Sequence, residues 1–174
     1  MDLPEFDIAG LFAAMDTKRI SAELSWSGAA EAIWAQSAVL NDRGHDHPIS
    51  PATITGMAKR GDTTCQHALF FLRWLERSPE SLLAGEGVRA EAPLPPCGPD
   101  RRLRWSLSRL SEALEAGRKE RELTWAQLAA DLRCTPNQLT GIRRAHFAIG
   151  MILAMRITQW LGRPAADFIY AARW

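Results

Sequence analysis

The sequence predicts an all-α protein made of two tandem helical bundles joined by a linker rich in proline and glycine. Three observations carry this prediction: apolar residues recur at helical spacing along most of the 174 residues, a long pattern occurs twice, and residues 86–100 are rich in helix-breaking residues. The expected units are residues 1–85 and 101–174. A chain that is 47% hydrophobic can bury one large core or two small ones, and the repeat favours two.

The first unit is expected to contain helices at residues 7–21, 25–42 and 50–60, then around 68–75 and 78–83. Asp7 and Ser25 are suitable N-caps for the first two, because a short polar side chain accepts a hydrogen bond from the first turn. The second helix is expected to be long, because neither glycine nor proline occurs between Ile33 and Gly44.

The second half repeats the first closely enough to indicate duplication. At the Ser50 segment the offset between the copies falls from 99 to 85 positions, so the first copy carries 14 extra residues, roughly 34–48. Near Trp74 and Trp160, which are expected in the core, the offset is 86. The residues that recur identically 99 positions later are Leu11, Ala14, Arg19, Glu23, Leu24, Trp26 and Ala30, matched by Leu110, Ala113, Arg118, Glu122, Leu123, Trp125 and Ala129.

One motif stands at the centre of each copy: SPATITGMAKR at residues 50–60 and TPNQLTGIRR at residues 135–144. Each begins with a hydroxyl N-cap and a proline in the first turn, continues through Thr-Gly, and ends with two basic residues. Together with Leu24-Ser-Trp26 and Leu123-Thr-Trp125, these motifs resemble the helix-turn-helix of phage repressor and Cro-like (XRE-like) transcription regulators. The resemblance implies two lambda-repressor-like bundles, each with its third helix facing double-stranded DNA.

In such regulators the third helix lies in the major groove, with its first residues near base edges and its flanks near phosphates. Ile54, Met57 and Ala58 are expected on the inward face of the first copy, and Leu139 and Ile142 on that of the second. The candidate DNA-binding residues are Ser50, Ala52, Thr53, Thr55, Lys59, Arg60, Thr135, Asn137, Gln138, Thr140, Arg143 and Arg144.

The two copies differ in what they could read. Asn137 is the one amide at a base-facing slot able to make the bidentate contact with adenine, whereas the first copy offers Pro51 and Ala52. The mid-helix glycines Gly56 and Gly141 could allow a close backbone approach or pack against a neighbouring helix. Sequence reading is therefore expected mainly from the second copy.

Charge is distributed unevenly along the chain. Residues 1–100 hold 8 Lys+Arg against 14 Asp+Glu, net −6, while residues 101–174 hold 13 against 6, net +7. A basic half is the electrostatic footprint expected of a phosphate-binding surface. The C-terminal unit is therefore expected to make the stronger DNA contact.

Other functions have less support in the sequence. The three cysteines are odd in number and widely spaced, and His45-Asp46-His47 supplies too few ligands for zinc, so no metal or cofactor is expected. No nucleophile or phosphate-loop motif points to an enzyme. No leader or membrane-spanning run is evident, so a cytoplasmic protein is expected.

Two alternatives stay open. The acidic first unit could be a protein-interaction module that keeps the motif as a scaffold, and RNA binding is a weaker option because base-stacking platforms are not evident. The extended second helix would project beyond its bundle, so its apolar side needs cover from a second copy or from the C-terminal unit. The residues expected at such a homodimer interface are Trp34, Val39 and Leu40.

Overall fold

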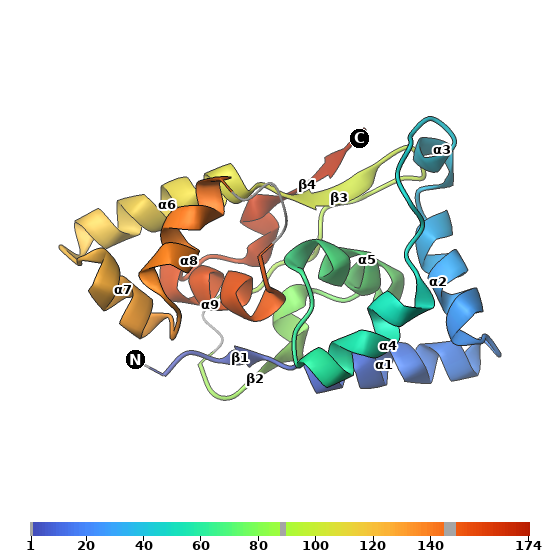
Figure 1. Ribbon diagram of the computed structural model, residues 1–174, viewed down its shortest axis with the longest axis horizontal. Helices are drawn as coiled ribbons and strands as arrows, with labels where there is room; N and C mark the ends of the chain where they lie inside the picture. Colours follow the sequence, from blue (N-terminus) through green and yellow to red (C-terminus); the bar gives the residue numbers. More distant parts are fainter. Residues whose placement is uncertain (1, 88–89, 145–148) are drawn as a thin grey trace.

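A computed structural model describes residues 2–87, 90–144 and 149–174, and the two halves follow a similar order of elements, except that α3 occurs only in the first half and η2 only in the second (Figure 1). Residues 88–89 of the expected linker and 145–148 of the second unit lie outside the described residues. The first half contains β1 (Glu5–Phe6), α1 (Ile8–Ser21), α2 (Trp26–Ala35), α3 (Ala38–Asn41), α4 (Pro51–Arg60), α5 (Cys65–Leu75), η1 (Pro79–Leu82) and β2 (Leu83–Ala84). The second contains β3 (Arg102–Trp105), α6 (Leu107–Glu120), α7 (Trp125–Asp131), α8 (Pro136–Gly141), η2 (Ile142–Arg144), α9 (Met151–Leu161), η3 (Ala165–Phe168) and β4 (Ile169–Ala172).

The fold is mostly helical, but the all-α prediction is wrong because each half is closed by a small antiparallel sheet. β1 pairs with β2, and β3 pairs with β4 in the register Arg102↔Ala172 to Trp105↔Ile169. Each sheet joins the beginning of its unit to its end. Strands of two to four residues are too short to produce a recognisable alternation of polar and apolar residues. The helical spacing of the much longer helices was therefore the only periodicity evident in the sequence, and it indicated an all-α fold.

The long second helix is also not formed, because α2 ends at Ala35 and the short α3 follows after Ser37. Side chains take over the carbonyl groups that a continuous helix would use. Asn41 Nδ2 donates to the Trp34 carbonyl at 2.8 Å, and Arg73 Nη2 donates to the Gln36 carbonyl at 2.7 Å. Ser37 is buried and donates its hydroxyl to the Arg101 carbonyl, so contacts with distant segments hold the break.

The two halves are related by a pseudo-two-fold arrangement. The Cys65 N–H donates to the Ile149 carbonyl at 2.7 Å, and the Met151 N–H donates to the Thr63 carbonyl at 2.8 Å. Residues 63 and 65 are 86 positions before residues 149 and 151, so these hydrogen bonds are equivalent. Likewise β1 contacts α9 as β3 contacts α5, and α5 packs on α9. Such reciprocity is the mark of an isologous interface, here within one chain.

Buried residues of both halves form one continuous core, which corrects the expectation of two separate cores. Trp160 and Phe71, both fully buried, belong to the two equivalent helices α9 and α5. The indole of Trp105 donates to the Cys65 carbonyl at 3.0 Å, and Glu80 accepts the Ala165 N–H at 2.7 Å. The linker contributes as well, since the Pro99 carbonyl accepts the Leu40 N–H.

Candidate nucleic-acid interface

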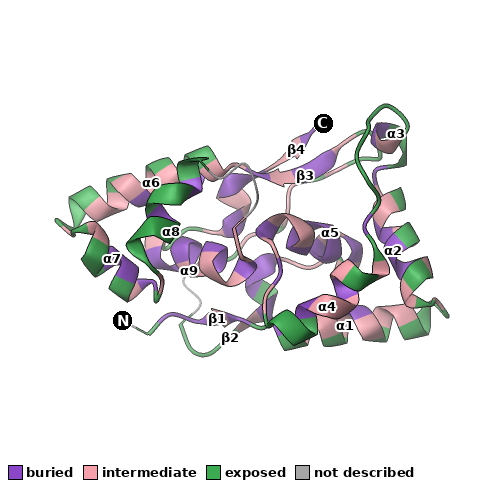
Figure 2. Ribbon diagram, in the orientation of Figure 1, coloured by how far each residue is buried: buried purple, intermediate pink, exposed green. Residues whose placement is uncertain are grey.

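Helix α4 carries the first group of candidate residues on an exposed face. Ser50 caps it as predicted, accepting the Thr53 N–H at 3.3 Å, and Gly61 ends it in the left-handed conformation. Ile54 and Met57 are buried as predicted, whereas Ala58 is exposed because it lies on the outer face. Ser50, Ala52 and Lys59 are exposed, and Thr53 and Thr55 are half-buried (Figure 2).

Helix α8 presents a more polar set of side chains. Thr135 accepts the Gln138 N–H, and Gln138 Oε1 accepts the Thr135 N–H at 2.8 Å, so the two residues form a capping box. Leu139 and Ile142 are buried as predicted. The exposed residues are Thr135, Asn137, Gln138, Thr140, Arg143 and Arg144. Within the described residues no hydrogen bond engages the Asn137 side-chain amide, so its donor and acceptor are available to a ligand.

The basic side chains of the two helices differ in their availability. Lys59, Arg143 and Arg144 are exposed and form no ion pair with any described residue. Arg60 instead folds back over its own helix, where Nη2 donates to the Thr53 carbonyl and Nη1 covers Gly56. The surroundings of Gly141 are open, so neither glycine is required by a neighbouring helix.

Two arginines near the interface are structural in both halves. The Arg19 guanidinium lies 4.6 Å from the Trp26 ring centroid and donates to the Leu24 carbonyl. Arg118 repeats this arrangement with Trp125, at 4.8 Å, and the Leu123 carbonyl. Both tryptophans are half-buried wedges. Arg118 is therefore engaged within its own unit and is a poor candidate for phosphate contact.

A groove of about 630 Å³ opens beside α8. It is lined by Ser111, Trp125, Leu139 and Arg143, among others. In the first half Phe12 stands at the position equivalent to Ser111 and stacks on Trp26, with ring centroids 5.1 Å apart. The small hydroxyl of Ser111 leaves open beside Trp125 the space that the Phe12 ring fills beside Trp26.

The three residues expected at a homodimer interface do not lie together on one exposed surface. Trp34 stacks on Phe70 with centroids 6.0 Å apart, and Leu40 is buried. Val39 is exposed to 38% of its surface. The chain itself thus covers most of the apolar side that was expected to need a partner, and dimerisation stays a prediction.

Sequence reasoning missed a cluster of arginines on β3. Arg102 and Arg104 contact Asp46, the central residue of the His45-Asp46-His47 segment. The sequence signal was the density of basic residues in RRLRW at residues 101–105, where three of the five residues are arginine. Among the described residues, no group of three or more His, Cys, Asp or Glu side chains is placed to hold a metal ion.

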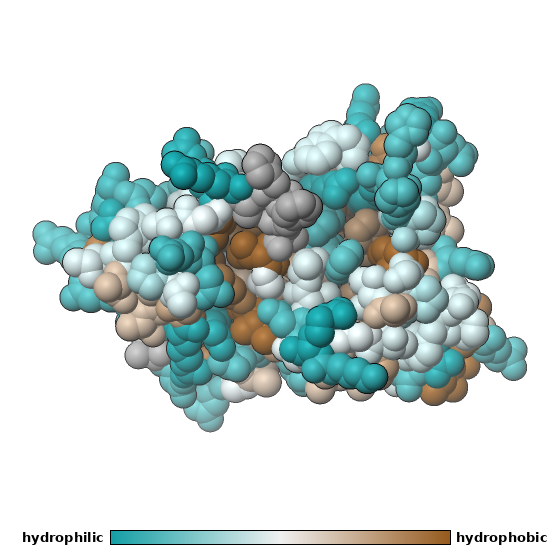
Figure 3. All heavy atoms as spheres, viewed as in Figure 1, coloured by the Kyte–Doolittle hydropathy of each residue, from teal (hydrophilic) through white to brown (hydrophobic). Residues whose placement is uncertain are grey.

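α4 and α8 lie on the side of the molecule that faces the viewer in Figure 1, and Figure 3 shows side chains of intermediate hydropathy mixed with hydrophilic ones over both. Hydrophobic side chains are visible in the hollow between the two units. A scan of protein-family models and searches of curated proteins and solved structures find no significant match to this chain. In the described part of the chain, no helix has the length and apolar character needed to cross a membrane.

Proposed function

We propose that this protein is a DNA-binding transcription regulator in which α4 and α8 of one chain act as the two reading helices of a pseudo-dimer. The observation that carries this proposal is the reciprocal pair of hydrogen bonds between residues 63–65 and 149–151, which lie just before α5 and α9. A symmetric junction at this point relates α4 to α8 by the same pseudo-two-fold operation. Two-fold dimers of helix-turn-helix proteins use this arrangement to reach two half-sites.

The charges available on the two helices agree with this role. Lys59, Arg143 and Arg144 are exposed and without ion pairs to described residues, so their phosphate contacts would require no internal bond to be broken. At the start of α8 the Asn137 amide makes no hydrogen bond with described residues, and an adenine edge can be read there. The first helix has Ala52 near the corresponding position, so α4 positions the protein and α8 selects the sequence.

This division of labour predicts an unequal palindrome. A pseudo-two-fold axis places the two half-sites in inverted orientation, about one helical turn apart, as in other helix-turn-helix dimers. Only the half-site under α8 should carry strong base preference. Selection from random duplex would test this, and Asn137→Ala should relax the preference at one position by about 1–3 kcal/mol. Two direct repeats, or no enriched sequence, would contradict the proposal.

Phosphate contact is tested by the double variant Arg143→Ala with Arg144→Ala. It should weaken binding to specific and random duplex alike and reduce the slope of log K against log salt by about 2, since each contact contributes about 0.9. The matched control is Arg77→Ala with Arg163→Ala, which removes the same charge at two equivalent positions whose guanidinium groups contact Ser81 and Asp167. Equal loss in both double variants would indicate a general charge effect only.

The rival function is a protein-interaction module, favoured by the net charge of −6 on residues 1–100 and by the apolar Pro51 and Ala52 at the start of α4. Duplex binding that is absent at low salt would favour this rival. The DNA-binding proposal includes a cytoplasmic location and a protein that needs no cofactor.

A further inference from the structure

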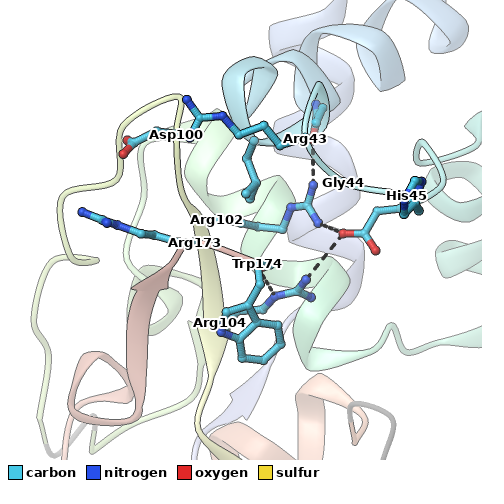
Figure 4. Close-up of a pocket in the computed structure, with 11 residues that line it drawn as sticks. Arg43, Gly44, His45, Asp100, Arg102, Arg104, Arg173 and Trp174 are labelled. Atoms are coloured by element: carbon cyan, nitrogen blue, oxygen red, sulfur yellow. Dashed lines mark hydrogen bonds and ion pairs between the residues drawn. The ribbon is translucent and has the colours of Figure 1, made fainter.

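The 14 residues that only the first half carries build one wall of a pocket. This hollow of about 460 Å³ lies between the α3 region, the loop that follows it and the β3–β4 pair (Figure 4). Its volume is within the range of small-molecule sites, about 300–1,000 Å³. The charged and aromatic residues of its lining are Arg43, Arg102, Arg104, Arg173, His45, Asp46, Asp100 and Trp174.

Arg102 is the buried anchor of the pocket, with 3% of its surface exposed. Its guanidinium lies 4.6 Å from the Trp34 ring centroid and donates to Asn41 Oδ1 at 2.7 Å. It also pairs with Asp46, whereas its buried Nε finds no hydrogen-bond partner among the described residues. A buried guanidinium needs a counter-charge, and among the described residues Asp46, whose side chain is 55% exposed, is the carboxylate that pairs with it.

Asp46 must serve two arginines. Arg104 Nη2 lies 3.8 Å from the same Asp46 oxygen. Burial lowers the pKa of Arg104, and the neighbouring Arg102 lowers it further, while Asp46 opposes both effects. The positive charge at this point is therefore incompletely balanced.

Two further arginines flank the pocket. Arg43 and Arg173 are exposed lining residues that form no ion pair with described residues, and in Figure 4 both extend away from the carboxylate that Arg102 and Arg104 contact. The lining thus holds four guanidinium groups against the side-chain carboxylates of Asp46 and Asp100. An excess of planar donors in a hollow is suited to a phosphoryl group, which accepts forked hydrogen bonds.

An aromatic surface lies beside these arginines. The Arg104 guanidinium is 5.0 Å from the ring centroid of Trp174, and Arg104 Nε donates to the Trp174 carbonyl at 3.2 Å. Even so, 67% of the Trp174 surface is exposed. A flat ring can stack on such an indole, as bases do on aromatic side chains.

We propose that this pocket binds a nucleoside monophosphate or a closely similar small molecule with one phosphoryl group and one flat ring. The phosphoryl group takes the place of Asp46 on Arg102 and Arg104, and the exposed side chains of Arg43 and Arg173, which line the same pocket, turn toward it. The ring stacks on Trp174. Because Asp46 lies four residues before the N-cap Ser50, its displacement also changes the segment that leads into α4. Binding itself does not depend on the DNA-binding proposal.

Isothermal titration of the whole chain with adenosine monophosphate, ribose 5-phosphate and adenosine tests the proposal. We expect the monophosphate to bind most tightly, ribose 5-phosphate at least about fivefold more weakly because it lacks the stacking ring, and adenosine not measurably. Equal binding of the two phosphates would overturn the role of Trp174. No binding of either phosphate would overturn the pocket as a phosphoryl site.

The variants lie at the exposed rim and leave the buried Arg102 in place. Arg173→Ala and Arg43→Ala should each weaken monophosphate binding about tenfold, as for a lost charge-assisted hydrogen bond. Asp46→Asn should strengthen it, because the competing carboxylate is neutralised, and Arg163→Ala is the control with unchanged affinity. Weaker binding by Asp46→Asn would overturn the displacement step. If Arg173→Ala weakened duplex binding while the wild type bound no monophosphate, the arginines would be a DNA contact and the proposal would fail.

Discussion

Replacement of Arg73 by alanine should uncouple three segments that a single guanidinium now joins. From α5, Arg73 donates to the carbonyls of Gln36, Cys97, Gly98 and Arg101 and to the Ser37 hydroxyl, at distances from 2.7 to 3.3 Å. These acceptors belong to the break between α2 and α3 and to the segment that connects the two halves. Arg73→Ala should therefore loosen the α3 region and this connection together.

The expected cost follows from these contacts. Hydrogen bonds to a charged group contribute about 1.5–3 kcal/mol each, but the Gly98 carbonyl is exposed and would regain water. Burial also lowers the pKa of Arg73, which shows that the charge is partly desolvated in the folded state and offsets some of the gain. The five contacts together should be worth about 2–4 kcal/mol of unfolding free energy, well below their simple sum.

Urea unfolding followed by far-UV circular dichroism measures this loss. At a slope of about 2 kcal/mol per molar urea, the midpoint of Arg73→Ala should fall by about 1–2 M. Arg73→Lys should lose most of the same stability, because an ammonium group cannot reach acceptors on both segments at once. The control is Arg77→Ala, whose contacts stay within four residues, at Ser81, and which should change stability by less than about 0.5 kcal/mol. Equal midpoints for Arg73→Ala and Arg77→Ala would refute the tether.

Three further predictions follow from the packing of the two halves. Burial raises the pKa of Glu80, although the Ala165 N–H that donates to this carboxylate acts in the opposite direction, so stability should fall as pH rises from the ordinary carboxyl range through the raised pKa. Thermal unfolding across this range should show that Glu80→Gln removes the fall and that the control Glu86→Gln does not. An unchanged pH profile in Glu80→Gln would show that burial of this carboxyl is not the cause. Ser111→Phe should fill the groove beside Trp125 as Phe12 fills the space beside Trp26, and it should raise the unfolding free energy by about 1–2 kcal/mol and the melting temperature by about 2–8 °C. The reverse change, Phe12→Ser, should lower both quantities. Destabilisation by Ser111→Phe would mean that the groove does not have the shape of the space that Phe12 fills. Protease cleavage within residues 86–96 should leave two fragments that co-elute in size-exclusion chromatography, because the buried residues of both belong to one core. The composition of this segment suggests instead two pieces that fold separately. Separate elution of folded fragments would contradict the shared core.

Local chemistry was sufficient to predict most of the helices. Asp7, Ser25, Ser50 and Thr135 each accept a first-turn N–H at the predicted helix start, because capping depends on neighbours within three residues. The repeat was also readable, and the recurring residues have matching roles. Arg19 and Arg118, for example, make the same contacts 99 positions apart.

The candidate interface could be predicted only in part. The sequence located α4 and α8 and their buried faces, since amphipathic spacing decides which side of a short helix is apolar. It could not show that Arg60 folds back over Gly56 while Arg143 and Arg144 stay unpaired within the described residues. Those differences depend on where a long side chain finds an acceptor, which residue type alone does not determine.

The sequence by itself determined the helix starts, the duplication and the unequal charge of the two halves, because each depends on residues that are close together or simply counted. Only the tertiary structure decided that two short sheets close the units, that α2 breaks before Ser37, and that α5 and α9 join one core. The physical reason is the same in each case. These features rest on hydrogen bonds and burial between residues far apart in the chain, such as Ser37 with Arg101 and Cys65 with Ile149, and such pairings leave no periodic trace in the sequence.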